Sequence, residues 1–116
     1  MRINIAEFEG PALLLQPEGR INVLTAEGFQ DDTMEAISSS PHDVIIDATN
    51  ITYLSTAGLR AFLSVSRTLA VSNRSLHICN LKPYILEVFQ IIGFDRVIPI
   101  HPDLDTVLTA IESKAS

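Results

Sequence analysis

The feature that most constrains the fold is a short run of apolar β-branched residues enclosed by two acids. The segment Asp43-Val44-Ile45-Ile46-Asp47 has no polar position between its ends. A strand with one solvated face alternates apolar and polar residues, whereas a continuous apolar run of this length is typical of a strand buried on both faces. Valine and isoleucine also favour strands over helices. The run therefore predicts the buried central strand of a sheet.

Strand-like and helix-like segments alternate along the rest of the chain. After two opening strands, this order favours right-handed crossovers and a mostly parallel sheet. We therefore expect an α/β fold in which residues 1–116 form a single domain, with a mostly parallel central sheet of about five strands and four helices. The pattern leaves open whether the helices cover one face of the sheet or both. The other expected strands cover residues 3–8, 12–16, 75–79 and 96–100, and the expected helices cover residues 26–38, 56–72, 83–92 and a last segment opened by Pro102.

Local signals predict where several of these elements begin and end. Pro17-Glu18-Gly19 is expected to end the second strand, and Thr25 is a candidate cap for the first helix. Pro83 suits the first turn of a helix, and Gly93 stands at its natural stop. Cys79 lies inside an apolar strand pattern, so we expect a buried and unreactive core thiol.

Charge and cysteine content argue against a nucleic-acid-binding, secreted or membrane protein. The chain has 8 basic and 14 acidic residues, a net charge of -6. Duplex binding depends on Lys and Arg meeting phosphates, so we expect no nucleic-acid partner. The N-terminus has acids where a signal peptide needs an apolar run, and no apolar stretch approaches the ~18 residues that span a bilayer. With a single cysteine and no internal disulfide, a cytoplasmic protein without a membrane partner is expected.

The sequence contains no cluster of residues typical of a metal site or a catalytic site. His42, His77 and His101 are isolated, with no ligand pair at helical or hairpin spacing, so we expect no metal site. The chain contains no G-x-S-x-G, Walker A or G-x-G-x-x-G motif. These observations predict no catalytic residue, no cofactor and no enzyme activity. A small-ligand-binding or enzymatic α/β domain stays open as an alternative from another class.

The most informative segment is Tyr53-Leu54-Ser55-Thr56-Ala57-Gly58-Leu59-Arg60, which leads into the second helix. The N–H groups of a helix N-terminus are free, and the dipole there favours negative charge. Ser55 or Thr56 can cap this helix, and a phosphate on either hydroxyl would meet a site suited to anions. Gly58 costs the helix about 1 kcal/mol relative to alanine, which indicates close approach of a neighbouring loop or a partner. We expect Gly58→Glu to weaken partner binding more than folding.

Arginines follow this segment at regular spacing. Arg60, Arg67 and Arg74 are seven residues apart and are expected along one flank of the helix. Thr56 lies four residues before Arg60 and near the same flank, so a phosphate on Thr56 is in reach of this guanidinium. The alternative is that Thr56 is only an N-cap and that the arginines form a solvated edge. The spacing alone leaves both interpretations open.

The run that ends at Asp47, followed by residues 53–60, resembles the signature of the STAS family, the "sulphate transporter and anti-sigma factor antagonist" domain. In that family a buried strand leads into an Asp-Ser-Ser/Thr-Gly-Leu or Ser-Ser-Ala-Gly-Leu-Arg turn that starts a helix. Gly19-Arg20-Ile21-Asn22 with Thr25-Ala26 is similar to the family's Gly-x-Leu-Asp turn. Residues 89–100 are similar to its closing helix–glycine–strand segment. The resemblance covers nearly the whole chain.

The resemblance implies a phosphorylation site and a contact surface. The family's phosphoacceptor corresponds to Thr56, and Ser55 is the competing hydroxyl. Two positions depart from the family: Ser55 replaces a common acid, and Asn22 replaces the usual Asp of the turn, keeping a capping side chain but not its charge. The implied partner-binding residues are Asn22, Ser55, Thr56, Ala57, Gly58 and Arg60.

The function implied by the resemblance is that of an anti-sigma factor antagonist, a regulator that switches partners. Such a protein binds an anti-sigma factor that is itself a serine/threonine kinase, and phosphorylation at Thr56 would release it. A PP2C-type phosphatase would restore the unmodified form. The main alternative is a STAS scaffold in a signalling or transport complex that is never phosphorylated, which Ser55 in place of the acid favours slightly.

Overall fold

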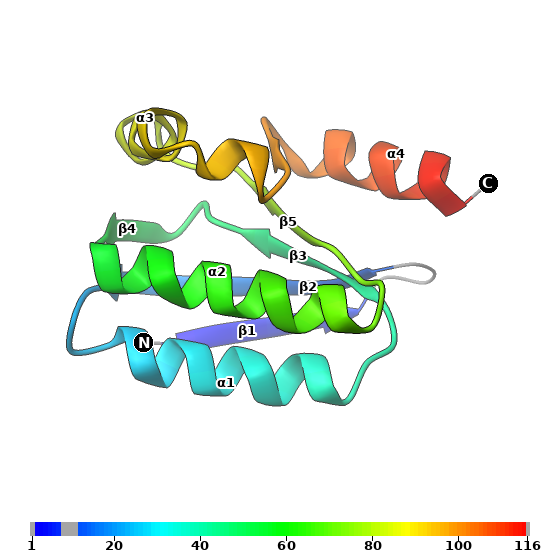
Figure 1. Cartoon of the computed structure of the whole chain (residues 1–116), viewed down its shortest axis with the longest axis horizontal. Helices are drawn as coiled ribbons and strands as arrows, with labels where there is room; N and C mark the ends of the chain where they lie inside the picture. The colour runs from blue at the N-terminus through cyan, green and yellow to red at the C-terminus, as the bar shows by residue number, and fades with distance from the viewer. Residues whose placement is uncertain (1, 8–11, 116) are drawn as a thin grey trace.

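The predicted central strand lies in the middle of the sheet. In the computed structural model, which describes residues 2–7 and 12–115, the strand order is β1-β2-β3-β5-β6. The β1/β2 pair is antiparallel and the other pairs are parallel, which confirms the predicted α/β fold (Figure 1). Phe8, expected in the first strand, lies outside the described residues. The elements are β1 Arg2–Glu7, β2 Ala12–Ile21, α1 Ala26–Ser38, β3 Asp43–Asp47, β4 Ile51–Leu54, α2 Thr56–Val71, β5 Leu76–Cys79, α3 Pro83–Ile92, the 3-10 turn η1 Phe94–Arg96, β6 Ile100–His101 and α4 Leu104–Ala115.

Strand β2 is longer than the sequence predicted, because it has two successive parallel partners. Its first part, residues 12–15, pairs with β3, and residues 19–21 pair with β4, a sixth strand that the sequence did not reveal. Pro17 has no N–H to donate, and it falls between these two paired parts. Gly19 has φ +110°, and the register shifts between Gly19 and Arg20. The predicted end of the strand at residues 17–19 was therefore wrong: the strand continues through the register shift to Ile21.

The strand predicted at residues 96–100 was also wrong. Gly93 ends α3 in the left-handed conformation, as predicted, and a 3-10 turn follows it directly. Phe94 in that turn packs edge-to-face against Phe89, with ring centroids 6.0 Å apart. Ile98 is fully buried although it lies in a loop, so burial without a strand explains the apolar pattern. Strand β6 is confined to Ile100–His101.

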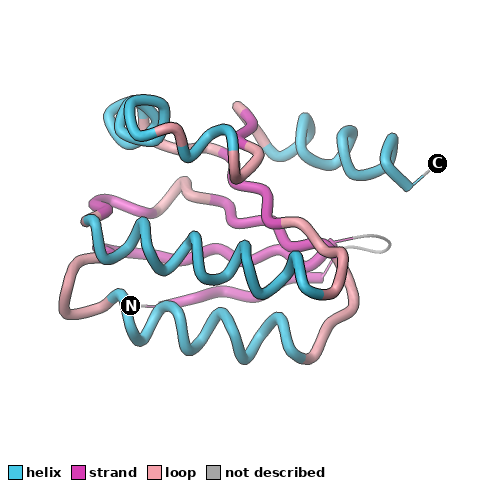
Figure 2. Tube along the Cα trace, in the orientation of Figure 1, coloured by secondary structure: helices cyan, strands magenta, loops and turns pink. Residues whose placement is uncertain are grey.

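The structure decides how the helices are placed: they cover both faces of the sheet. Alternate residues of each strand face opposite sides, so that Val44 and Ile46 join one core and Ile45 the other. Helices α1, α2 and α3 contribute to the first core, and α4 covers the other face (Figure 1). Figure 2 shows α1 and α2 running side by side, with α4 beyond the strands. Phe29, Phe62 and Phe89 link α1, α2 and α3 through ring contacts of 5.2 and 6.2 Å.

The second core contains the single cysteine. Cys79 is fully buried under α4, beside Val107 and Ile111. Burial, together with the carboxylates of Asp47 and Asp103, raises the pKa of the Cys79 thiol to about 12. The predicted burial of Cys79 in the core is confirmed, and a raised pKa keeps the thiol protonated at neutral pH.

Arg74 does not lie on the flank of α2 with Arg60 and Arg67. Helix α2 ends at Val71, and the Arg74 side chain turns back to the end of α1. Its Nη2 donates to the carbonyl oxygen of Ile37 at 3.1 Å, and its Nε donates to the carbonyl oxygen of His42 at 2.7 Å. A cation at the negative end of a helix dipole is stabilising. The solvated-edge interpretation was therefore wrong for Arg74.

Replacing Arg74 by alanine is expected to destabilise the protein by about 1–3 kcal/mol, because two charge-assisted hydrogen bonds to partly buried carbonyls are lost. Arg67→Ala is the matched control, since Arg67 is exposed on α2 and is expected to change stability by less than about 0.5 kcal/mol. Urea unfolding followed by circular dichroism compares the two variants. Equal midpoints would show that Arg74 does not hold the end of α1.

Candidate partner-binding site

The neighbouring hydroxyls of Ser55 and Thr56, at the N-terminus of α2, have different roles. Ser55 is the N-cap residue, with φ -87° and ψ 174°, and its Oγ accepts a hydrogen bond from the Gly58 N–H at 3.3 Å. Thr56 is the first residue of α2 and is exposed. Within residues 2–7 and 12–115, the Thr56 hydroxyl forms no hydrogen bond. The cap is therefore Ser55, and Thr56 leaves a solvent-facing hydroxyl at the positive end of the helix.

Gly58 is explained by the approach of two neighbouring strands. A Cβ atom at Gly58 would lie 2.4 Å from Leu54 Cδ1, 2.8 Å from Ile21 Cγ2 and 3.1 Å from the Ile21 carbonyl oxygen. Gly58 is buried, so the close approach inferred from the sequence occurs inside the molecule. The sequence had led us to expect that a large residue at position 58 weakens binding more than folding. The structure leads us to expect a loss of folding stability instead, because any side chain strains the junction of β2, β4 and α2.

The turn before α1 is held by a small network of hydrogen bonds. Asn22 Oδ1 accepts from the N–H groups of Leu24 at 2.9 Å and Thr25 at 3.2 Å, which is the backbone-capping role expected of Asn22. Thr25 Oγ1 donates to the Arg20 carbonyl oxygen at 2.6 Å and accepts from the Asn22 N–H at 2.9 Å. Thr25 holds the N-cap position of α1, but its side chain does not cap that helix. Its hydroxyl closes the turn instead.

The Asn22 turn and the start of α2 are joined directly. The Ser55 N–H donates to the Ile21 carbonyl oxygen at 2.8 Å, one residue before Asn22. All six residues predicted to bind a partner thus lie at one end of the molecule, the end shown at the left of Figure 1. Thr56 and Arg60 are exposed, Asn22, Ser55 and Ala57 are partly buried, and Gly58 is buried.

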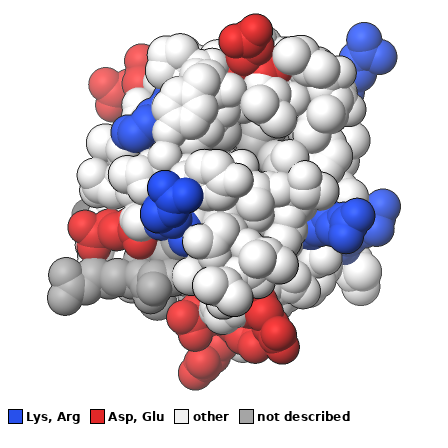
Figure 3. All heavy atoms as spheres, turned by 90° about the vertical axis from the view of Figure 1, so that its left-hand side faces the viewer, with Lys and Arg blue, Asp and Glu red and all other residues white. Residues whose placement is uncertain are grey.

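The centre of this end of the molecule is largely uncharged. Figure 3 looks onto it and shows Lys and Arg side chains within and around a largely uncharged central area. Asp and Glu side chains lie at the borders of this view. The net charge of -6 is therefore carried mainly outside this area.

Comparison with known proteins identifies the fold family. The model of the STAS domain matches residues 2–107. The chain belongs to the STAS domain family. The resemblance noted from residues 44–47 and 53–60 is thereby confirmed.

Relatives of this STAS protein are described as anti-sigma factor antagonists. The chain is 27% identical over 113 residues, 97% of each chain, to the "Putative anti-sigma factor antagonist BtrV" of Bordetella bronchiseptica. A crystal structure of an anti-sigma factor antagonist from Mycobacterium paratuberculosis has a TM-score of 0.84 at 20% identity, covering 96% of this chain and 93% of that one. The Bacillus cell fate determinant SpoIIAA in its phosphorylated form has a TM-score of 0.69 at 14% identity, covering 94% and 99%.

The sequence did not reveal two residues at the tip of the Asn22 turn of this STAS protein. Val23 is 77% exposed and Leu24 is 87% exposed, although both are large and apolar. The sequence did contain a signal for their exposure: both residues lie in a tight turn between Asn22 and Thr25, where a side chain cannot reach the core. Exposed apolar residues beside a candidate contact surface indicate a binding role.

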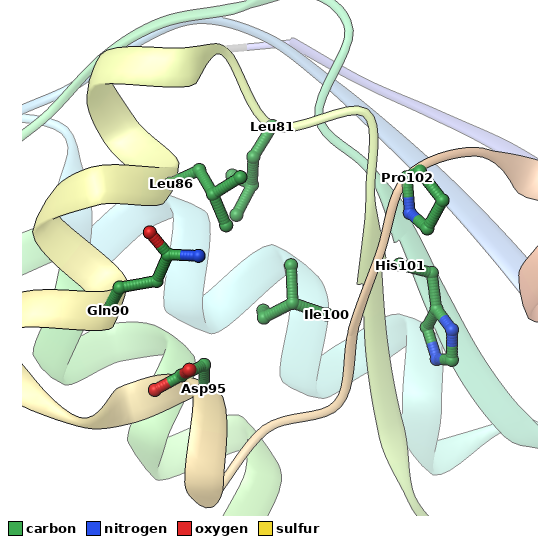
Figure 4. A pocket seen from close by; sticks show the side chains of 7 residues that line it. All are labelled: Leu81, Leu86, Gln90, Asp95, Ile100, His101 and Pro102. Carbon is green, nitrogen blue, oxygen red and sulfur yellow. The ribbon is translucent and has the colours of Figure 1, made fainter.

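A cavity lies away from this site, between α3, η1 and β6. Its volume is about 340 Å³, and Figure 4 shows the Gln90 amide extending toward Ile100, whereas the Asp95 carboxylate and the His101 ring are turned away from Ile100. His101 instead meets His77, with 3.1 Å between Nε2 and Nδ1. Polar groups of a ligand site usually converge on one point, and these do not. The described part of the chain has no group of three or more metal-ligating side chains, and none of its helices is long and apolar enough to cross a membrane.

Asp47 at the end of β3 has a structural role. Its carboxylate accepts hydrogen bonds from the Thr49 N–H at 3.1 Å, Asn80 Nδ2 at 3.0 Å and Gln16 Nε2 at 3.2 Å. Burial alone would raise the pKa of Asp47, but the hydrogen bonds outweigh it and hold the pKa below the ordinary 3.8. The ionised carboxylate thus links β2, β3 and the segment after β5.

The lowered pKa of Asp47 predicts a pH-dependent contribution to stability. Since the pKa is lower in the folded protein than in the unfolded chain, the contribution is complete above the unfolded value of about 3.8 and is lost as the pH falls through the folded value. Asp47→Asn should therefore be less stable than wild type at pH 7, and the difference should shrink in acid. Urea unfolding from pH 7 to pH 2 measures it. A difference that is constant with pH would contradict the assignment.

Proposed function

We propose that this STAS protein is a partner-switching anti-sigma factor antagonist whose switch is Thr56. In the unmodified state it binds an anti-sigma factor that is also a serine/threonine kinase, and phosphorylation of Thr56 ends the complex. One observation carries the proposal: Ser55 is used as the helix cap, which leaves Thr56 as the exposed hydroxyl at the start of α2. A PP2C-type phosphatase would restore binding, and the protein would act in the cytoplasm as a binding module and not as an enzyme.

The relatives support this proposal. BtrV and the Mycobacterium protein are described as anti-sigma factor antagonists. SpoIIAA has been solved in an unphosphorylated and in a phosphorylated form. This chain has the same fold and carries a free hydroxyl at the helix start, so we transfer the mode of regulation to it, with Thr56 as the acceptor.

The contact surface proposed for the kinase surrounds Thr56. It consists of the Asn22 turn with its exposed Val23 and Leu24, the first turn of α2, and Arg60 one turn further along. The hydrogen bond from Ser55 to Ile21 holds the turn and the helix in one arrangement. A rigid surface binds with less loss of conformational freedom than a flexible loop. Gly58 contributes by allowing this packing and not by touching the partner.

Phosphate on Thr56 would act on binding and not on folding. It adds a charge of about -1.5 to -2 at neutral pH, which must be desolvated when a partner covers the site. In the free protein the same charge is favoured by the α2 dipole, by about 0.3–1 kcal/mol, and lies near Arg60. The modified protein is thus stable while its complex is not.

Phosphorylation by the protein's own partner tests the proposal. The kinase that the protein retains from an extract of its cells is identified by mass spectrometry, purified, and incubated with the protein and ATP. Site-resolved mass spectrometry should find one phosphate, on Thr56. Phosphate on Ser55 would contradict the assignment. Stable binding without any phosphate would favour the scaffold alternative.

A further inference from the structure

Helix α3 has an apolar face that nothing in the described structure covers. Its inner face buries Ile85 and Phe89, whereas Val88 is 43% and Ile91 75% exposed on the outside. Ile92 is 47% exposed as well. Glu87 is the sole charged residue between Pro83 and Ile92. An amphipathic helix on a free surface would carry polar residues here, so the apolar positions indicate a surface that another molecule covers.

A pocket connects this face to the start of α2. It has a volume of about 180 Å³ and is only partly enclosed. The Tyr84 hydroxyl donates to the Thr52 carbonyl oxygen at 2.5 Å, and Lys82 Nζ donates to the Thr49 carbonyl oxygen at 2.8 Å, so α3 is tied to the β4 region across the pocket. The lining residues are Tyr53, Leu54, Leu59, Tyr84, Ile85 and Val88.

The size and position of the pocket favour a side chain of a protein partner. Pockets for small molecules usually have about 300–1,000 Å³, well above this volume. Leu59 lines the pocket and lies three residues after Thr56 on α2, so a partner placed over Thr56 is beside it. The pocket therefore continues the surface proposed for the kinase.

Three cations lie near the pocket, and the exposed Glu87 next to Val88 is the acid on the α3 side. The Arg20 guanidinium carbon lies 4.4 Å from the centre of the Tyr53 ring, Arg60 follows Leu59, and Lys82 precedes α3. Figure 3 shows Lys and Arg side chains within the uncharged area of this end, and side chains of both charges around it. A partner with carboxylates next to its apolar group fits these cations. A second copy of this chain fits less well, because each copy carries a net charge of -6.

We propose that the kinase-binding surface extends from Thr56 across β4 onto α3, and that the pocket there receives an apolar side chain of the kinase flanked by Asp or Glu residues. This inference rests on the proposed function and deepens it. The apolar side chain displaces water from Tyr53, Tyr84 and Val88, and the flanking carboxylates meet Arg20 and Arg60. The contact lies beside the hydroxyl that is modified and not at it, so it serves docking and not phosphoryl transfer.

The inference is tested with Val88→Glu, which places a charge at the pocket edge on an already exposed position. Val71→Glu is the matched control, because Val71 is 89% exposed at the far end of α2. With the purified kinase and ATP, Val88→Glu should raise the KM for phosphorylation of Thr56 at least tenfold and leave kcat within twofold, while Val71→Glu changes neither. Thermal melting checks that both variants are folded. An unchanged KM for Val88→Glu would overturn the proposal.

A second measurement does not depend on the kinase. Peptides selected from a random phage-displayed library against the immobilised protein should carry an apolar residue next to Asp or Glu, and should lose binding to Val88→Glu but not to Val71→Glu. Peptides without acidic residues, or indifferent to Val88→Glu, would overturn the proposal. So would a wild-type dimer in sedimentation that Val88→Glu dissociates, since the occupant would then be a second copy.

The two proposals fail in different ways. If Thr56 is phosphorylated and Val88→Glu has no effect on KM, the α3 pocket is not part of the surface and the proposed function stands. If acidic-apolar peptides occupy the pocket but the retained kinase leaves Thr56 unmodified, the switch is wrong and the docking surface stands.

Discussion

Replacing Thr56 by alanine is expected to give a protein that stays bound to its kinase in the presence of ATP, whereas the wild type is released as it becomes phosphorylated. The alanine variant has no hydroxyl to modify, and Ser55 remains engaged as the N-cap of α2. The two proteins should therefore bind equally at first and diverge only after ATP is added. Surface plasmon resonance with immobilised kinase follows this directly. Release of Thr56→Ala by ATP would contradict the proposed switch.

Thr56→Glu is expected to imitate the released state. A carboxylate at the first position of α2 is favoured by the helix dipole, so the variant should melt no lower than the wild type. Its affinity for the kinase should fall at least tenfold, because the charge must be desolvated in the complex. Thr109→Glu is the matched control, since Thr109 is also an exposed threonine on a helix but lies on α4, away from the site. Equal binding of the two variants would show that the start of α2 is not at the interface.

Ser55→Ala separates capping from modification. Loss of an N-cap serine costs about 0.5–2 kcal/mol of stability. Because the Ser55 hydroxyl accepts from Gly58 and is partly buried, this variant should be less stable than wild type and still be phosphorylated on Thr56. Mass spectrometry and urea unfolding of the same sample measure both properties.

Replacing Gly58 by alanine is expected to lower stability, although alanine is the better helix former by about 1 kcal/mol. The added Cβ would meet Leu54 Cδ1 at 2.4 Å and Ile21 Cγ2 at 2.8 Å, and the Ile21 carbonyl oxygen at 3.1 Å belongs to the backbone and cannot rotate away. Overpacking of this kind costs about 1–3 kcal/mol, which exceeds the gain in helix propensity. Gly58→Glu should cost still more.

Gly28→Ala is the control for this effect. Gly28 lies within α1, where a Cβ would have no atom within 4 Å, so the substitution should raise stability by up to about 1 kcal/mol. Opposite signs in urea unfolding would establish that packing, and not helix propensity, requires glycine at position 58. A stabilised Gly58→Ala would contradict the close packing of β2, β4 and α2.

Local patterns in the sequence were sufficient to predict most helices and the central strand. Helix α1 was predicted with its observed ends, and α3 begins at Pro83 and stops at Gly93 as expected, because cap and stop residues act within one turn of the chain. The apolar run of β3 required no tertiary information, since a short β-branched run of this kind is typical of a strand buried on both faces. The family was indicated by resemblance, chiefly of residues 44–47 and 53–60 to the family signature.

Tertiary structure decided what depends on residues distant in the sequence. The length of β2 depends on a second partner, β4, and the pattern of β2 alone does not contain that partner. Arg74 has the spacing of a surface residue, but the end of α1 lies within its reach only in the folded chain. The use of Ser55 as cap, with Thr56 free, depends on the Ile21 carbonyl that positions the start of α2. The chain by itself determined which hydroxyls stand at that helix start, and the packing of β2 against α2 decided which of them faces solvent.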